Sequence, residues 1–145
     1  MRILFVSTLK RKVSEDETAS RSQIIFQLAK GLAEKGHDVS LIATGDSVIP
    51  GVTIIPIIEK GWVDLPPVEN AFFREVATIT TLAEKIVALQ DSFDMIHNHL
   101  YPEFFLPVIQ DRLHIPMVTT IHIQAADYID DLLANYKKNF GIMIY

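Results

Sequence analysis

The sequence predicts an α/β fold in which a mainly parallel, doubly wound sheet carries helices on both faces. Short apolar runs rich in β-formers alternate with helical patterns, and the runs lack the polar alternation of half-exposed strands. Right-handed crossovers then favour a six-stranded Rossmann-like sheet of order 3-2-1-4-5-6. The length of 145 residues suits one domain, and we expect it to span residues 1–145.

Six apolar segments are predicted to be strands of this sheet. The third contains Pro56, which has no N–H to donate, so this strand is expected to lie at an edge or to end there. The predicted strands cover residues 2–7, 38–44, 52–57, 94–98, 115–122 and 141–145.

Four segments have apolar residues at helical spacing, namely 22–35, 68–90, 102–114 and 125–140. Ser20 and Gln23 fit a capping box at the start of the first, and Gly36 fits its end. Pro107 predicts a kink or break in the third. In the second, the β-branched run 78–81 argues against one unbroken helix. Its buried face is predicted to comprise Phe72, Val76, Ile79, Ala83 and Ile86.

Composition narrows the function classes. The net charge of −5 argues against a general electrostatic grip on nucleic acid or on an anionic membrane. The lack of cysteine excludes disulfides and thiolate catalysis. The first residues enter a strand pattern directly, without a signal peptide, and no apolar run approaches the length of a membrane span. A cytoplasmic location is therefore expected.

The topology predicts where a ligand binds. In doubly wound sheets ligands dock outside the carboxyl ends of the strands, at the switch point between strands one and four. That edge gathers Ser7, Thr8, Asn98 and His99. The next strand ends at the same edge, so His122 is expected to reach in.

Three histidines near this edge admit several interpretations. His97 and His99 are two residues apart in a strand and share one face, with His122 on the neighbouring strand. Three imidazoles can bind zinc, but no acidic residue or fourth ligand follows at a familiar spacing, so no metal site is predicted. His97 is expected to be a packed residue satisfied by backbone. His99 and His122 are expected to lie further out and to contact a ligand.

The loop after the first strand lacks the motifs of common nucleotide sites. No glycine occurs before residue 31, which disfavours a dinucleotide-binding turn, and no P-loop is present. What remains is the helix start near Ser20, whose free N–H groups favour an anion, with Arg21 and the basic run 10–12 adding charge. The alternative is that residues 10–17 form a solvated, mobile loop.

Two aromatic stretches, around residues 62–73 and 101–105, are candidates to line a ligand pocket. Tyr101 is the preferred exposed contact. The alternative is that the phenylalanines anchor their helices in the core.

Four segments in order resemble the N-terminal half of family-4 retaining glycosyltransferases, which have the two-domain GT-B fold. They are "MRILFVS", "LAKGLAEKGHDVSLIAT", "FDMIHNH" and "PMVTTIH". The resemblance implies transfer of a sugar from a nucleotide-sugar donor to a sugar or lipid-linked acceptor, with retention at the anomeric carbon and no cofactor. His122 then matches the catalytic-centre histidine of the family's T-x-H motif, which begins at Thr120. His99, Ser7, Thr8 and Arg21 fall in substrate-binding positions.

Two departures from the family's pattern qualify this expectation. The Gly-Gly pair usual in the first loop is replaced by "SEDETASRS", so close backbone approach there is doubtful. The donor-binding C-terminal domain lies outside these 145 residues, so the chain alone is not expected to be competent without that domain in cis or in trans. Peripheral membrane association of the full enzyme and self-association of this chain are compatible with the resemblance, while nucleic acid is not an expected partner.

Two other functions stay open at this point. One is a stand-alone, non-catalytic α/β binding module. The other is a metal-dependent hydrolase that uses His97, His99 and His122.

Overall fold

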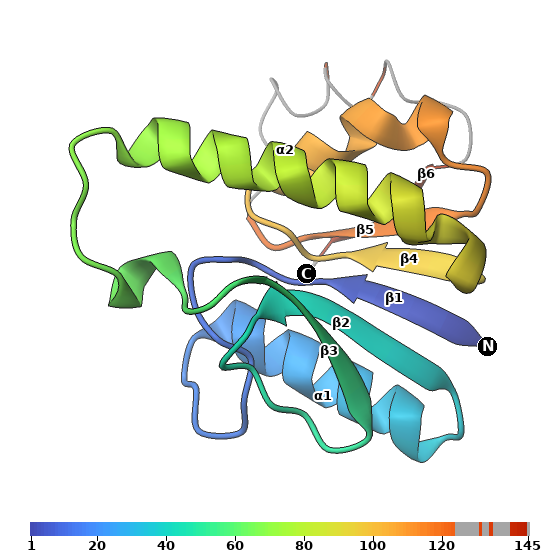
Figure 1. Cartoon of the computed structure of the whole chain (residues 1–145). Helices are drawn as coiled ribbons and strands as arrows, with labels where there is room; N and C mark the ends of the chain where they lie inside the picture. Colours follow the sequence, from blue (N-terminus) through green and yellow to red (C-terminus); the bar gives the residue numbers. More distant parts are fainter. Residues whose placement is uncertain (124–130, 132–133, 135–139, 145) are drawn as a thin grey trace.

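A computed structural model describes residues 1–123, 131, 134 and 140–144. Its centre is a six-stranded parallel sheet with the order β3-β2-β1-β4-β5-β6, as predicted (Figure 1). The strands are β1 (Arg2–Val6), β2 (Asp38–Thr44), β3 (Val52–Ile58), β4 (Met95–Asn98), β5 (Met117–Ile121) and β6 (Phe140–Ile144).

The pairing register fixes which residues meet at the carboxyl edge. Val6 of β1 pairs with Ile42 on one side and with Asn98 on the other. The edge position of β3 confirms the prediction from Pro56, which pairs with Ala43 where the register shifts. The carboxyl ends of β1, β4 and β5 therefore lie next to one another.

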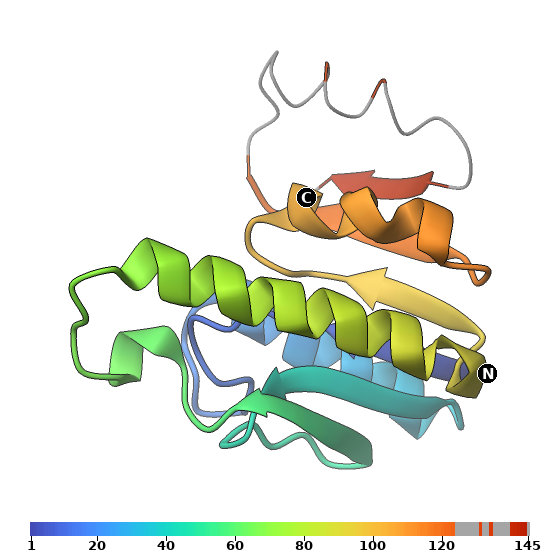
Figure 2. The ribbon, with the colours of Figure 1, turned by 45° about the horizontal axis from the view of Figure 1, so that its top comes forward.

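Helices cover both faces of the sheet, and the alternation along β1 shows the two layers. Ile3 and Phe5 pack with α1 (Ser20–Glu34), whereas Leu4 and Val6 pack with α2 (Ala71–Leu89). The 3₁₀ helix η3 (Glu103–Arg112) shares the second layer with α2, as Figure 2 shows. Each strand of the centre thus buries both of its faces, which explains its continuous apolar sequence.

The predicted capping box at the start of α1 is wrong. The N-cap is Ala19, and Ser20 is the first helical residue, without a side-chain cap. The Gln23 side chain instead donates to the Glu17 carbonyl oxygen. The Glu17 carboxylate accepts the N–H groups of Thr18 and Ala19 at 2.8 and 3.0 Å. A glutamate outside the helix therefore orders the chain that enters it.

The predicted end of α1 is confirmed. Gly36 has φ of +86°, and its N–H donates to the Ala33 carbonyl oxygen at 2.9 Å. The next N–H, of His37, reaches the Leu32 carbonyl oxygen at 3.1 Å. These two bonds form the Schellman pattern, which favours glycine at the residue with positive φ.

Helix α2 is continuous through its β-branched run, against expectation. The hydroxyls of Thr78, Thr80 and Thr81 each donate to the carbonyl oxygen four residues earlier. They are thereby satisfied within the helix. Its buried residues are Ile79, Leu82, Ala83 and Ile86.

The predicted burial of Phe72 is wrong, since it is 73% exposed, and Val76 is only partly buried. The first turns of α2 extend past the carboxyl ends of the strands, where there is no sheet to cover them (Figure 1).

The segment after β4 is helical as predicted, but it forms a 3₁₀ helix around Pro107 instead of an α-helix. The predicted helix over residues 125–140 falls mostly outside the described residues, and β6 begins at Phe140. Within the described part of the chain, no helix is long and apolar enough to cross a bilayer.

Candidate functional site

The ends of β1 and β4 bring two predicted site residues together. The backbone N–H of His99 donates to the Val6 carbonyl oxygen at 2.8 Å, and that of Ser7 donates to the Ile42 carbonyl oxygen at 2.9 Å. Ser7 and His99 are both fully buried. The Ser7 hydroxyl and the His99 Nε2 atom have no hydrogen-bond partner among the described residues.

The three histidines form one cluster. His99 Nδ1 and His122 Nε2 are 2.9 Å apart, which joins the ends of β4 and β5. The His99 ring lies 4.1 Å from the His97 ring, centre to centre, and stacks on Phe5 at 5.6 Å with 9° between the planes. His97 Nε2 is bonded to the Thr120 hydroxyl at 2.9 Å. His97 is therefore satisfied by a side chain, and the expected backbone partner is wrong.

The expectation that His99 lies further out than His97 is wrong, whereas His122 is only partly buried, as expected. His99 is fully buried, while His97 retains 7% exposure. The reason is tertiary, because Arg21 from α1 and Glu103 from η3 cover the end of β4. The Arg21 guanidinium donates to the Leu100 carbonyl oxygen at 2.8 Å and to Glu103 Oε1 at 2.5 Å.

Glu103 is the member of this cluster that the sequence reading missed. Its Oε1 atom accepts the backbone N–H of His122 at 3.1 Å as well as the Arg21 bond, and its Oε2 atom is buried without a partner among the described residues. The signal was present, since an acid stands in the apolar run "PEFFLP" directly after the histidines. A carboxylate in such a run is rarely buried unless it is paired.

Burial makes the histidines poor bases. Burial is the main reason why the pKa of His97 is lowered to about 4, that of His99 to about 2 and that of His122 to about 4. Their mutual repulsion adds to the shift for His97 and His99, and the Arg21 charge adds to it for His99 and His122. At neutral pH the cluster consists of uncharged imidazoles beside one Arg–Glu pair.

Two predicted substrate-binding residues, Asn98 and Thr120, are buried and form hydrogen bonds within the carboxyl edge. The Asn98 amide donates to the Glu103 carbonyl oxygen at 2.9 Å and to the Thr119 hydroxyl at 3.1 Å, and its oxygen accepts the Leu100 N–H. Thr120 is fully buried and bonded to His97. Both side chains therefore shape the turn after β4 and the end of β5.

A second group of predicted residues surrounds a hollow of about 310 Å³ at this edge. Tyr101, 37% exposed, forms one wall, with the Lys10 ammonium 4.0 Å and the Arg21 guanidinium 5.2 Å from its ring centre. The Ser22 hydroxyl is buried there without a partner among the described residues. The lining residues are Thr8, Lys10, Arg11, Ala19, Arg21, Ser22 and Tyr101.

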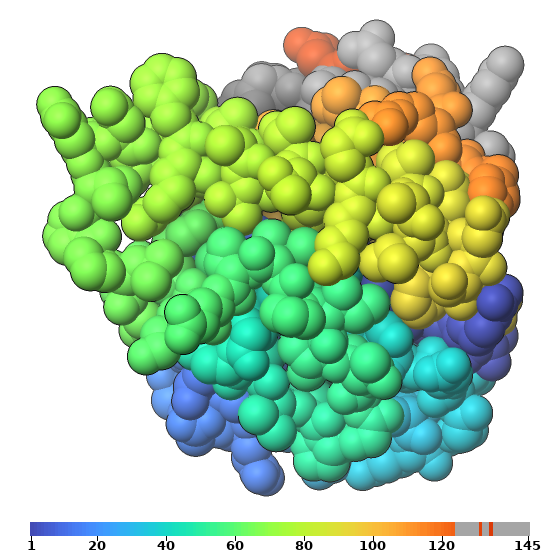
Figure 3. Space-filling view, viewed as in Figure 1, coloured from blue at the N-terminus to red at the C-terminus, as the bar shows by residue number. Residues whose placement is uncertain are grey.

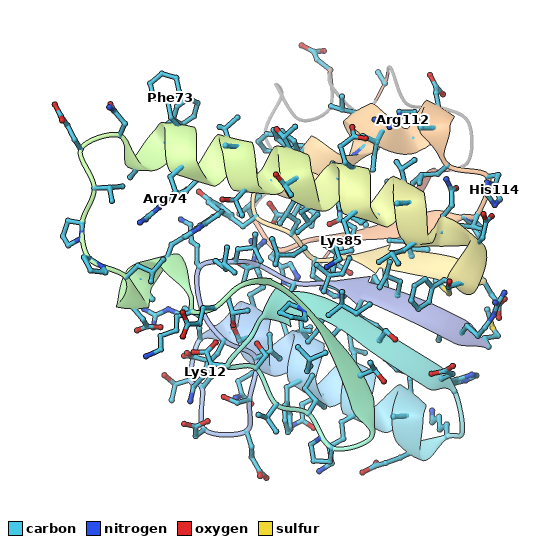
Figure 4. The ribbon with its side chains drawn as sticks, in the orientation of Figure 1. Lys12, Phe73, Arg74, Lys85, Arg112 and His114 are labelled. Carbon is cyan, nitrogen blue, oxygen red and sulfur yellow. The ribbon has the colours of Figure 1, made fainter. Side chains whose placement is uncertain are left out.

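The loop after β1 lacks the Gly-Gly pair, yet backbone hydrogen bonds join it to the segment at residues 61–63. The carbonyl oxygens of Leu9 and Lys10 accept the N–H groups of Trp62 and Val63 at 3.0 and 3.2 Å. A Cβ on Gly61 would lie 2.5 Å from the Lys10 carbonyl oxygen, so the close approach is made by a glycine of the opposing segment. Lys12, labelled in Figure 4, is outside the hollow, in an exposed pair with Asp16 at 2.8 Å.

The predicted aromatic contacts divide into two kinds. Trp62 is buried in the core, whereas Phe72 and Phe73 are 73% and 69% exposed, so the core-anchor alternative is wrong for both phenylalanines. Phe73 points away from the helix in Figure 4, and the start of α2 projects from the molecule in the space-filling view (Figure 3).

The arrangement suits hydrogen bonding to a polar or anionic ligand. Within the described part of the chain, no three histidine, aspartate or glutamate side chains are grouped to hold a metal ion. His99 Nδ1 and His122 Nε2 bond to each other and are thus already engaged.

The comparisons with known proteins assign a family. A sequence model described as Glycosyltransferase Family 4 matches residues 22–143, which include α1 from its third residue onward, the histidine cluster and β5. No curated protein matches the chain significantly. The chain therefore belongs to glycosyltransferase family 4.

Proposed function

We propose that this domain is the acceptor-side half of a retaining glycosyltransferase, which transfers a sugar from a nucleotide-sugar donor to an acceptor. The carrying observation is that Arg21, Lys10 and Tyr101 line a hollow of about 310 Å³ at the carboxyl edge of the sheet, and that Glu103 joins Arg21 to the His122 backbone there. In this proposal the edge forms one wall of a GT-B cleft. A donor-binding domain, in cis or in trans, supplies the other wall, and this chain alone is inactive.

The roles follow from the polar groups at the edge. His122 contacts the donor sugar near the reacting carbon, supported by His99 and Thr120. Thr8, Arg21 and Tyr101 hold the sugar or lipid-linked acceptor. The uncapped start of α1 and the Lys10 ammonium favour phosphoryl oxygens, so the leaving diphosphate is stabilised by fixed protein charges, without a cofactor.

The overhanging start of α2 supports the remaining partner proposals. Phe72 and Phe73 offer apolar surface next to the cleft edge. Such surface favours self-association of this domain by itself and peripheral contact of the full enzyme with a membrane that presents a lipid-linked acceptor.

The test is His122→Ala in the complete enzyme, meaning this domain together with its donor-binding domain. We expect kcat for transfer to fall about 100-fold, the scale for loss of one substrate-stabilising donor. Hydrolysis of the donor should fall in parallel, because His122 is assigned to the donor sugar.

The matched control is His114→Ala. His114 lies at the other end of the sheet, where Nε2 pairs with Asp91 at 2.9 Å (Figure 4). An unchanged kcat in His122→Ala would remove the assigned role.

A further inference from the structure

The contact between His99 and His122 contains one shared proton, which has two possible positions. Two neutral imidazoles 2.9 Å apart must place one N–H opposite one lone pair. Either His99 donates from Nδ1, or His122 donates from Nε2. Because a neutral imidazole carries only one N–H, the choice also decides which group each ring presents on its other nitrogen.

The surroundings of His99 distinguish the two arrangements. If His122 donates, then His99 carries its proton on Nε2, which is fully buried and has no partner among the described residues. If His99 donates, the buried Nε2 is a bare lone pair. A buried N–H without an acceptor is the rarer and costlier defect, so donation by His99 is favoured.

The two rings are held in place from several sides. The His99 ring packs against the rings of both Phe5 and His97, which also contact each other, with ring centres 4.9 Å apart. The charged groups that face the pair are the Arg21 guanidinium, bonded to the His99 carbonyl oxygen at 3.3 Å, and Glu103, which accepts the His122 N–H. His122 is thus fixed through its backbone by Glu103 and through its ring by His99.

We propose that His99 is a positioning residue that donates from Nδ1 to His122, so that His122 keeps its own proton on Nδ1 and presents a hydrogen-bond donor at the carboxyl edge. This inference rests on the proposed function. The ligand atom that it serves is an acceptor oxygen, either a sugar hydroxyl or a phosphoryl oxygen. With its pKa lowered to about 4, His122 remains a neutral donor at pH 7.

The direct test is ¹⁵N NMR of this chain with labelled histidine rings at pH 7, recording which nitrogen of each ring bears a proton. We expect His99 and His122 both to be protonated on Nδ1, with a scalar coupling across the His99–His122 bond. For assignment, the variants His37→Ala and His114→Ala identify the signals of the two rings outside the cluster. A proton on His122 Nε2, or averaging between tautomers, overturns the proposal.

A kinetic test in the complete enzyme separates positioning from packing. His99→Leu fills the site without a donor, whereas His99→Asn restores an N–H at a similar distance from the backbone. We expect kcat to fall about tenfold in His99→Leu, less than on removing the His122 donor itself, and to recover partly in His99→Asn. An unchanged kcat in His99→Leu overturns the inference. The proposed function is overturned only if His122→Ala also leaves kcat unchanged.

Discussion

Two Arg–Glu pairs at opposite ends of the sheet use the same chemistry for different purposes. At the carboxyl edge, the Arg21 and Glu103 side chains are 15% and 1% exposed and 2.5 Å apart. Toward the amino edge, the Arg112 and Glu84 side chains are 49% and 59% exposed, and two bonds of 2.6 and 2.7 Å join them. Desolvation lowers the pKa of Arg21, whereas the hydrogen bonds that Arg112 donates to Glu84 raise the pKa of Arg112.

The difference shows where the fold accepts an unfavourable burial of charge. A surface pair contributes little to stability, and a buried pair costs desolvation energy that its bonds must offset. Around the buried pair, polar atoms also remain without partners among the described residues. They are Ser7 Oγ, Ser22 Oγ, His99 Nε2 and Glu103 Oε2. Such a concentration is typical of a ligand site.

The largest effect is expected from breaking the buried pair. Arg21→Ala leaves the Glu103 carboxylate buried without its cation, and we expect the free energy of unfolding to fall by roughly 3 kcal/mol. Arg112→Ala, the matched control, should leave it nearly unchanged. Urea unfolding of both variants provides the measurement. Equal effects would contradict the contrast between the two edges.

The next effect concerns pH. The folded-state pKa values of His97 and His122, both about 4, and of His99, about 2, lie below the ordinary value of 6.5. Between those values and pH 6.5 the unfolded chain therefore binds more protons than the folded chain. Stability should therefore fall as the pH drops below about 6.5, by up to about 1.4 kcal/mol per pH unit for each histidine. Chemical denaturation at pH 7 and pH 5 measures this.

His99→Leu should lose about one proton from that slope, because one of the three rings with a lowered pKa is gone. A stability that is flat between pH 7 and pH 5 would show that the cluster is not buried as described.

The smallest effect is expected at the rim of the hollow. Tyr101→Ala removes the ring beneath Lys10, and we expect the KM for the acceptor to rise about fivefold with little change in kcat, on the scale of one exposed ring contact. Tyr101→Phe keeps the ring and serves as the control. Steady-state kinetics of both variants at varied acceptor concentration provide the measurement. A change in kcat alone would contradict a role of Tyr101 in acceptor binding.

The sheet order and the gathering of Ser7, His99 and His122 at one edge could be predicted, because they follow from strand order and period-two alternation. The depth of His99 could not, since it depends on Arg21 and Glu103 folding over the end of β4. The capping box at Ser20 failed for a local reason. The Glu17 carboxylate accepts the N–H groups of the next two residues, Thr18 and Ala19, so the helix begins one residue earlier than the capping box requires.

Hydrogen exchange of the complete enzyme, with and without an added nucleotide sugar, tests most directly whether substrate meets this domain at the carboxyl edge. The account predicts slower exchange at residues 8–11, 99–103 and 122, around the histidine cluster and the hollow. The control region is the second hollow, of about 330 Å³, lined by residues 110 and 113–117 toward the amino edge. Slower exchange confined to that region would contradict the account.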